Sequence, residues 1–90
     1  MNSEDFTLLI EQHRHEFYTY IYRQLWDKSQ CDDVFSQAMM TAWEKIDSFQ
    51  EGSNFRAWVY QIMTYKCLST NKAKHKYSQV SLEDLREQLL

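Results

Sequence analysis

The chain has 90 residues, enough for one domain whose core needs no disulfide, and 43% of its residues are hydrophobic. No apolar run reaches the ~20 residues of a membrane span, and the net charge of −3 argues against a general nucleic-acid coat. Proline is absent and glycine occurs once, so tight hairpin turns lack their usual residues. We therefore expect an all-α fold, a compact bundle of three to four helices in residues 1–77. Residues 78–90 are expected to begin a linker or a short acidic amphipathic helix.

The first predicted helix runs from about Glu4 to Trp26, because its apolar residues recur every three or four positions and form one stripe. Ser3 or Asp5 is the expected N-cap. The stripe contains Phe6, Leu9, Ile10, His13, Phe17, Tyr20, Ile21 and Leu25. Residues 27–30 break this pattern and are expected to form a short connection.

The second predicted helix has the clearest pattern, and its first turn holds Asp32 and Asp33, whose carboxylates suit the positive end of the helix dipole. Its predicted core stripe is Phe35, Ala38, Met39, Ala42, Trp43 and Ile46. Its opposite face is Asp33, Gln37, Met40 and Glu44. On spacing alone, this opposite face is most simply a solvated surface, since single exposed apolar residues such as Met40 are ordinary.

A polar loop follows, in which Gly52 is expected to take a positive φ angle. Ser53 or Asn54 should cap a third helix, and capping is the simplest role for Asn54 on sequence alone. This helix is expected to end near Ala73 in a polar, basic segment. Its predicted buried residues are Phe55, Trp58, Val59, Ile62 and Met63, and its predicted outer face is Arg56, Tyr60, Thr64, Tyr65, Cys67, Leu68 and Lys72.

The charges are distributed unevenly along the chain. Residues 1–53 contain four basic and ten acidic side chains, whereas residues 54–77 contain five basic side chains and no acidic one. A localised basic segment of this kind permits contact with phosphates, although lysines near Lys72 also suit the negative end of a helix dipole. A second acidic amphipathic stretch begins at Ser81.

The sequence does not favour an enzyme. It contains no Ser/His/Asp set and no phosphate-binding loop, so we expect neither catalysis nor a cofactor. His13 and His15 are two residues apart and point to different faces of a helix, and Cys-x-x-Cys is absent, so no metal site is expected. Cys31 and Cys67 fit free thiols in a reducing cytosol, which predicts a cytoplasmic protein that does not bind membranes.

The segment from Asp32 to Lys45, followed by Phe49 and the block from Gly52 to Ile62, resembles region 2 of bacterial RNA polymerase sigma factors. It is most similar to the extracytoplasmic-function group, and the resemblance covers about residues 6–77. The family pattern is an acidic pair, an apolar pair, Gln-Glu, a helix that ends near Trp, a short loop, and Asn-Phe-Arg-Ala-Trp. The chain departs from the family pattern at two places. Ser36-Gln37 replaces Gln-Glu, and a lysine-containing segment replaces the usual arginine-rich end of the last helix.

The resemblance implies that the domain binds core RNA polymerase and recognises and melts the promoter −10 element during transcription initiation. The second helix would dock on the clamp helices of the largest polymerase subunit. Its docking residues would be Asp33, Gln37, Met40 and Glu44. The loop and third helix would capture a flipped base of the non-template strand and contact neighbouring DNA. Those residues would be Ser53, Asn54, Arg56, Tyr60, Thr64, Tyr65, Ser69 and Lys72.

The resemblance also allows an anti-sigma factor as a further partner. The residues alone leave a second interpretation open, in which the chain is a helical protein–protein interaction module without DNA binding. In that case the acidic face of the second helix would be the functional surface.

Overall fold

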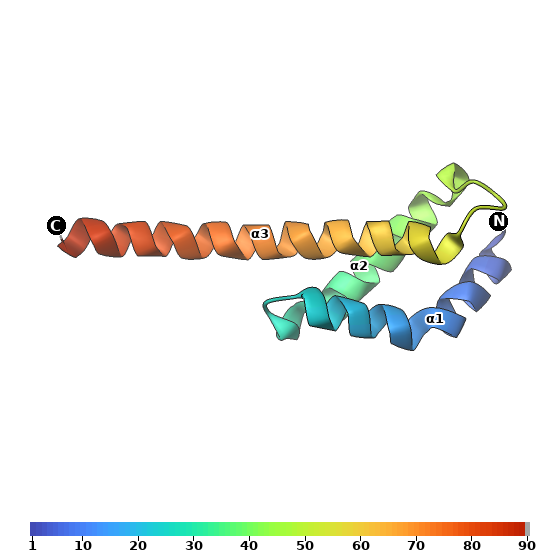
Figure 1. Cartoon of the computed structure of the whole chain (residues 1–90), viewed down its shortest axis with the longest axis horizontal. Helices are drawn as coiled ribbons and strands as arrows, with labels where there is room; N and C mark the ends of the chain where they lie inside the picture. Colours follow the sequence, from blue (N-terminus) through green and yellow to red (C-terminus); the bar gives the residue numbers. More distant parts are fainter. Residues whose placement is uncertain (90) are drawn as a thin grey trace.

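The computed structural model describes the backbone of residues 1–89 and the side chains of residues 1–73. Along the chain, the elements are α1 (Ser3–Gln24), the 3-10 turn η1 (Lys28–Gln30), α2 (Cys31–Glu44), the 3-10 turn η2 (Ile46–Ser48) and α3 (Phe55–Leu89). Over residues 1–89 there is no strand, which confirms the all-α prediction. Figure 1 shows α1 and α2 packed against the first half of α3, whose second half extends beyond them.

The first helix is capped by Asn2, not by Ser3 or Asp5 as predicted. The Asn2 side chain accepts a hydrogen bond from the Asp5 backbone N–H at 2.8 Å. Asn2 can do so because its backbone is extended, with φ −92° and ψ 173°, as an N-cap requires. Asp5 is therefore inside the first turn, where its carboxylate suits the helix dipole.

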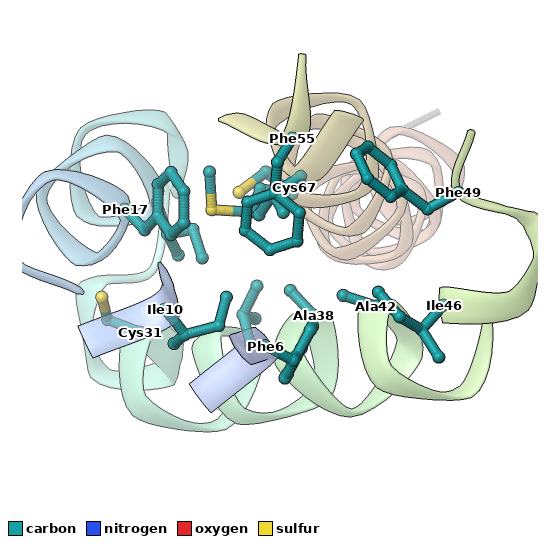
Figure 2. Close-up of a cluster of buried hydrophobic side chains, with 14 of the residues drawn as sticks. Phe6, Ile10, Phe17, Cys31, Ala38, Ala42, Ile46, Phe49, Phe55 and Cys67 are labelled. Atoms are coloured by element: carbon teal, nitrogen blue, oxygen red, sulfur yellow. The ribbon is translucent and has the colours of Figure 1, made fainter. Parts of the chain in front are cut away.

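The core lies where the three helices meet, and Figure 2 shows buried side chains from all of them pointing into one cluster. Its members are Phe6, Ile10, Phe17, Ile21, Leu25, Cys31, Val34, Ala38, Ala42, Ile46, Phe49, Phe55, Val59, Met63 and Cys67. On α2, Ala38 and Ala42 have no exposed surface, and their small side chains let the backbone of α2 come close to the other two helices. Each large apolar side chain buried here contributes about 1.5–3 kcal/mol.

The buried stripe of α2 is rotated relative to the predicted one. It consists of Cys31, Val34, Ala38 and Ala42, at steps of three and four residues. Trp43 was predicted in the core, but 42% of it is exposed, and its ring lies at the rim, 5.2 Å from the centroid of Phe6. Trp43 follows Ala42 and lies about 100° further around the helix, at the edge of the packed face.

Cys67 was also predicted wrongly, because the structure buries it where the sequence pattern suggested an outer face. Phe55, Val59, Met63 and Cys67 follow one another at four-residue steps and form the buried stripe of α3. Steps of four drift slowly around an α-helix with 3.6 residues per turn, so this stripe turns toward α1 along its length. Burial raises the pKa of the Cys67 thiol.

The third helix does not end near Ala73 but continues without a break to Leu89. No glycine or proline occurs after Gly52, so nothing in this segment interrupts the helix. A helix of 35 residues is about 52 Å long, which accounts for the long axis of a molecule that measures 59 × 23 × 17 Å. The predicted boundary after residue 77 falls within α3, and the side chains that bear on it lie outside the described residues.

One buried polar side chain ties the end of α1 to α3. Asn71 is only 9% exposed, and its Nδ2 donates to the backbone carbonyl of Gln24 at 2.8 Å. Its Oδ1 accepts from the backbone N–H of Trp26 at 3.0 Å. A single amide thus satisfies a carbonyl at the C-terminal end of α1 and an N–H of the following connection. In the described part of the chain, no helix is long and apolar enough to cross a membrane.

Candidate functional site

The loop between η2 and α3 is a short polar turn that the neighbouring residues hold in place. Gly52 has a φ of +84°, as predicted, and a Cβ there would meet open space, so the glycine is required by its backbone angle and not by crowding. The Ser53 backbone N–H donates to the carbonyl of Gln50 at 3.0 Å, and the Ser53 hydroxyl donates to the same carbonyl. The turn therefore has a defined shape at the entrance to α3.

Asn54 caps α3, and of the two candidates the sequence offered, it is the one whose side chain makes the bond. Its Oδ1 accepts from the backbone N–H of Ala57 at 3.1 Å, and its backbone carbonyl accepts from the N–H of Trp58 at 3.1 Å. This cap uses the amide oxygen alone. An asparagine amide also carries two N–H donors, so capping is compatible with a second role for this exposed side chain.

Aromatic rings fix the loop against the helices. Phe49, the last anchor before the turn, lies 5.6 Å from Phe55 and 5.3 Å from Trp58, measured between ring centroids. Phe55 also contacts Phe6 of α1 edge to face, at 6.0 Å. Such pairs contribute about 0.5–1.5 kcal/mol beyond the area they bury. The start of α3, the loop and α1 are therefore joined by one apolar cluster.

The residues predicted to contact DNA from α3 divide between two faces of that helix. Arg56, Tyr60 and Thr64 lie on the side that meets α1, a boundary that we call the α1/α3 seam. The hydroxyls of Thr64 and Tyr20 are hydrogen bonded at 2.6 Å, and the Tyr60 ring packs edge to face against Phe17 and Tyr20. Tyr60 and Thr64 are thus only partly exposed, and they contribute to the packing of α1 on α3.

Arg56 is also occupied at this seam. Its Nε donates to Oε2 of Glu16 on α1 at 2.8 Å, and its Nη2 donates to the same oxygen. The guanidinium lies over the Tyr60 ring, 5.1 Å from the centroid. These hydrogen bonds from Arg56 lower the pKa of the Glu16 carboxyl to about 2, and the same carboxylate raises the pKa of Arg56.

The opposite face of α3 is open. Tyr65 and Leu68 are 70% and 63% exposed, and Ser69 and Lys72 complete a stripe at steps of three, one and three residues. Beside this stripe lies a groove of about 440 Å³ between α3 and the end of α2. The groove is lined by Thr41, Glu44, Lys45, Gln61, Ile62, Tyr65 and Lys66.

Sequence reasoning missed most of this groove. Lys66 belongs to the basic segment that the sequence already marked, so its charge was a usable signal. Lys45 carried no such signal, because it reaches the groove only through the way α2 passes across α3 (Figure 1). Tyr65 is the residue that belongs both to the groove and to the predicted DNA-binding set.

The predicted docking residues of α2 do share one exposed face. Asp33, Gln37, Met40 and Glu44 follow at steps of four, three and four residues, and Met40 is 61% exposed. Trp43, three residues after Met40, adds an exposed indole where the sequence pattern predicts a core residue. We call these five residues the α2 face. Since Glu44 also lines the groove, the α2 face and the groove are continuous at the end of this helix.

The metal-ligating side chains in the part of the chain that the structure describes are scattered. In residues 1–73, no three His, Cys, Asp or Glu side chains are grouped as a metal ion would require. Cys31 and Cys67 are free thiols and both are buried. The exposed groups beside the groove are mainly aromatic, cationic and amide groups on α3, and the α2 face presents acidic, amide and apolar groups.

Comparison with known proteins gives two matches. The family model described as Sigma-70 region 2 matches residues 9–76. The curated protein "ECF RNA polymerase sigma factor SigW" of Bacillus subtilis (strain 168) is 27% identical over 63 residues, which are 70% of this chain and 34% of that protein. The chain thus spans about a third of the length of this relative. No solved structure shows a significant match.

Proposed function

The chain belongs to the Sigma-70 region 2 family, and from that premise we propose that it binds core RNA polymerase and recognises and melts the promoter −10 element. The similarity to a protein named as an ECF RNA polymerase sigma factor supports a sigma factor role. The domain acts through binding free energy and not through covalent chemistry. It holds the unpaired non-template strand and so shifts the equilibrium from duplex to open DNA.

The observation that carries this proposal is the open face of α3 beside the groove. It combines an exposed aromatic ring, Tyr65, with the cations Lys66 and Lys72 and the amide of Gln61. Unpaired bases stack on aromatic side chains with about 1–3 kcal/mol per base, and cations follow the phosphate backbone. We therefore assign the strand contact to this face and not to Arg56, Tyr60 and Thr64 at the α1/α3 seam.

The turn before α3 is the proposed site for a flipped base. Extrusion of a base breaks its stacking at a cost of a few kcal/mol, so the pocket must return comparable free energy. Ser53 and Asn54 are exposed at this turn. The Ser53 hydroxyl donates to the Gln50 carbonyl, so its oxygen is left to accept, and the Asn54 amide offers N–H donors for the edge of the base. Because Asn54 is already held as the helix cap, its donors would be presented with little loss of side-chain entropy.

The α2 face is the proposed docking surface for the clamp helices of the polymerase. Its carboxylates can accept charge-assisted hydrogen bonds from basic residues, and Met40 and Trp43 can fill apolar pockets of the partner. Docking through this face would bring the groove next to polymerase-bound DNA, since Glu44 is shared by both. An anti-sigma factor that covered the same face would prevent docking.

A direct test measures the binding of fluorescent single-stranded −10 oligonucleotides to this chain in complex with bacterial core polymerase. We expect sequence-selective binding that requires the chain and that Asn54→Ser reduces. Serine keeps a capping oxygen but removes the amide N–H donors, so Asn54→Ser should leave the melting temperature nearly unchanged. If the chain neither binds core polymerase nor confers selectivity on it, the proposed function is wrong.

One observation favours a second candidate, a protein-interaction module without DNA binding. Two large apolar side chains, Met40 and Trp43, are exposed within the acidic α2 face, as in many protein–protein interfaces. In that case Met40→Asp would abolish partner binding, whereas Asn54→Ser and Tyr65→Ala would have no effect on any activity.

A further inference from the structure

Arg56 lies where a positive charge is locally unfavourable. It belongs to the first turn of α3, the positive end of the helix dipole, and that turn contains no acidic residue of its own. The missing negative charge comes from α1, because Glu16 accepts two hydrogen bonds from the Arg56 guanidinium. On the other side of Glu16, His13 Nδ1 lies 3.3 Å from Oε1. The carboxylate is therefore held between two helices.

We propose that Glu16 is a positioning residue that fixes the start of α3, and that Arg56 acts through Glu16 and not through contact with DNA. The readout on DNA rests on the proposed function above. The contacts between Glu16 and Arg56 do not depend on that function, because they lie within the chain.

The position of Arg56 explains how the ion pair can control the base-binding turn. Arg56 is two residues from Asn54, and Phe55 between them is buried against Phe6 of α1. The aromatic cluster holds the inner side of this first turn, while the pair between Glu16 and Arg56 holds its outer side. Together they restrain the rotation of the turn, and so the direction in which the Asn54 side chain points.

The geometry also disfavours a phosphate contact through the Nε side of the Arg56 guanidinium. A guanidinium binds an anion best through two parallel N–H donors, and here Nε and Nη2 are both directed at Glu16. One of its two flat faces lies over the Tyr60 ring, with Cζ 5.1 Å from the ring centroid. A phosphate would have to displace the carboxylate before it could use the same donors.

The two roles predict opposite effects of Glu16→Gln on binding of −10 oligonucleotides by the complex with core polymerase. If Arg56 contacts DNA, removal of its competitor strengthens binding. If Glu16 positions the turn, removal of its charge weakens binding, by about two- to fivefold for a partly exposed ion pair. The matched control is Glu11→Gln, since Glu11 pairs with Arg14 at 3.1 Å within α1 and does not reach α3.

Charge reversal sharpens the test. Arg56→Glu alone places two carboxylates together and should weaken binding under either role. The double variant Glu16→Arg with Arg56→Glu rebuilds the pair with its charges exchanged, so it restores binding only if Arg56 acts through Glu16. Loss of binding in the double variant, or tighter binding of Glu16→Gln, would overturn the proposal.

A second measurement needs no DNA. Hydrogen exchange of the Ala57 amide reports the Asn54 cap directly, because this N–H donates to the Asn54 side chain. We expect faster exchange in Glu16→Gln, unchanged exchange in Glu11→Gln, and recovery in the double variant. Unchanged exchange in Glu16→Gln would refute the positioning role, whether or not the chain binds DNA. Failure of the unaltered chain to bind DNA would count only against the proposed function.

Discussion

Asn71 shows how much a single polar side chain can contribute to this small fold. The end of a helix leaves backbone carbonyl and N–H groups without partners inside the helix. At the end of α1, the Asn71 amide bonds one such carbonyl, of Gln24, and the N–H of Trp26. The sequence pattern predicts that Asn71 lies in a basic, solvated helix end. Hydrophobic periodicity identifies buried apolar residues only and gives no information about buried polar ones. Nothing in the local pattern distinguishes such a tie from a surface asparagine.

Replacement of Asn71 by leucine should therefore destabilise the chain although it adds apolar volume. The Gln24 carbonyl and the Trp26 N–H would both lose their partner, at about 1–3 kcal/mol for each group that stays buried. Urea denaturation followed by circular dichroism measures the loss. Asn71→Asp keeps the acceptor oxygen for the Trp26 N–H, but it sets a charged carboxylate oxygen against the Gln24 carbonyl at a buried site, so it should also destabilise the chain. Equal stability of Asn71→Leu and the unaltered chain would contradict the assigned bonds.

Glu16 gives a prediction for pH dependence. Its pKa is about 2 in the folded chain, below its ordinary value of 4.5, because Arg56 donates hydrogen bonds to the charged form. A lowered pKa means that its stabilising contribution is present above about pH 4.5 and is lost as the pH falls toward 2. Nuclear magnetic resonance titration of the Glu16 carboxyl should give a low midpoint that rises in Arg56→Gln. A midpoint near 4.5 in the unaltered chain would show that the pair does not form in solution.

At the scale of the elements, α3 combines two surfaces with different tasks. One side packs against α1 through Tyr60 and Thr64, and the other presents Tyr65 and Lys72 to solvent. Hydrophobic spacing predicted the helix and most of its buried residues. Hydrophobic spacing could not show which of the remaining residues lie at the α1/α3 seam and which lie on the open face. That depends on the angle at which α1 crosses α3, which the local sequence pattern does not determine.

Two tyrosines on this helix should consequently respond in opposite ways to replacement by alanine. Tyr60→Ala removes contacts with Phe17 and Tyr20 and should destabilise the chain by about 1–3 kcal/mol, less than a fully buried aromatic would. Tyr65→Ala should change stability by less than about 0.5 kcal/mol, and weaken oligonucleotide binding by about fivefold or more. Denaturation and fluorescence anisotropy measure the two effects. Destabilisation by Tyr65→Ala of the same size as by Tyr60→Ala would contradict the division of faces.

At the scale of the whole molecule, the sequence was informative where local rules decide and uninformative where helices cross. Hydrophobic periodicity, the absence of proline and the single glycine were enough to predict the helices, the loop and its positive φ angle. The exposure of Trp43 and the burial of Cys67 follow instead from which face of α2 packs on its neighbours and from the drift of the α3 stripe. Lys45 joins the groove for the same reason. Each of these features depends on how the helices pack, which a short stretch of sequence does not predict.

The distribution of charge over the molecule leads to a prediction about salt. The chain is acidic as a whole, with a net charge of −3, so the free chain should bind DNA weakly. The cations of α3 should contribute only when docking on polymerase holds DNA against this helix. Each phosphate neutralised on a single strand contributes about −0.7 to the slope of log affinity against log salt. Lys72→Gln should therefore make that slope shallower by about 0.7 for the complex with core polymerase.

Lys28 provides the matched control for this measurement. It is also an exposed lysine, but its Nζ donates to the Tyr22 carbonyl at the end of α1 and lies 4.8 Å from the centroid of the Tyr22 ring. Lys28→Gln removes the same charge from η1, at a lysine that neither lines the groove nor belongs to the open face of α3, so the salt slope should not change. A difference between the two variants places the DNA backbone along the open face of α3. Equal changes in slope would mean that only net charge matters, and the strand would then have to be assigned to another surface.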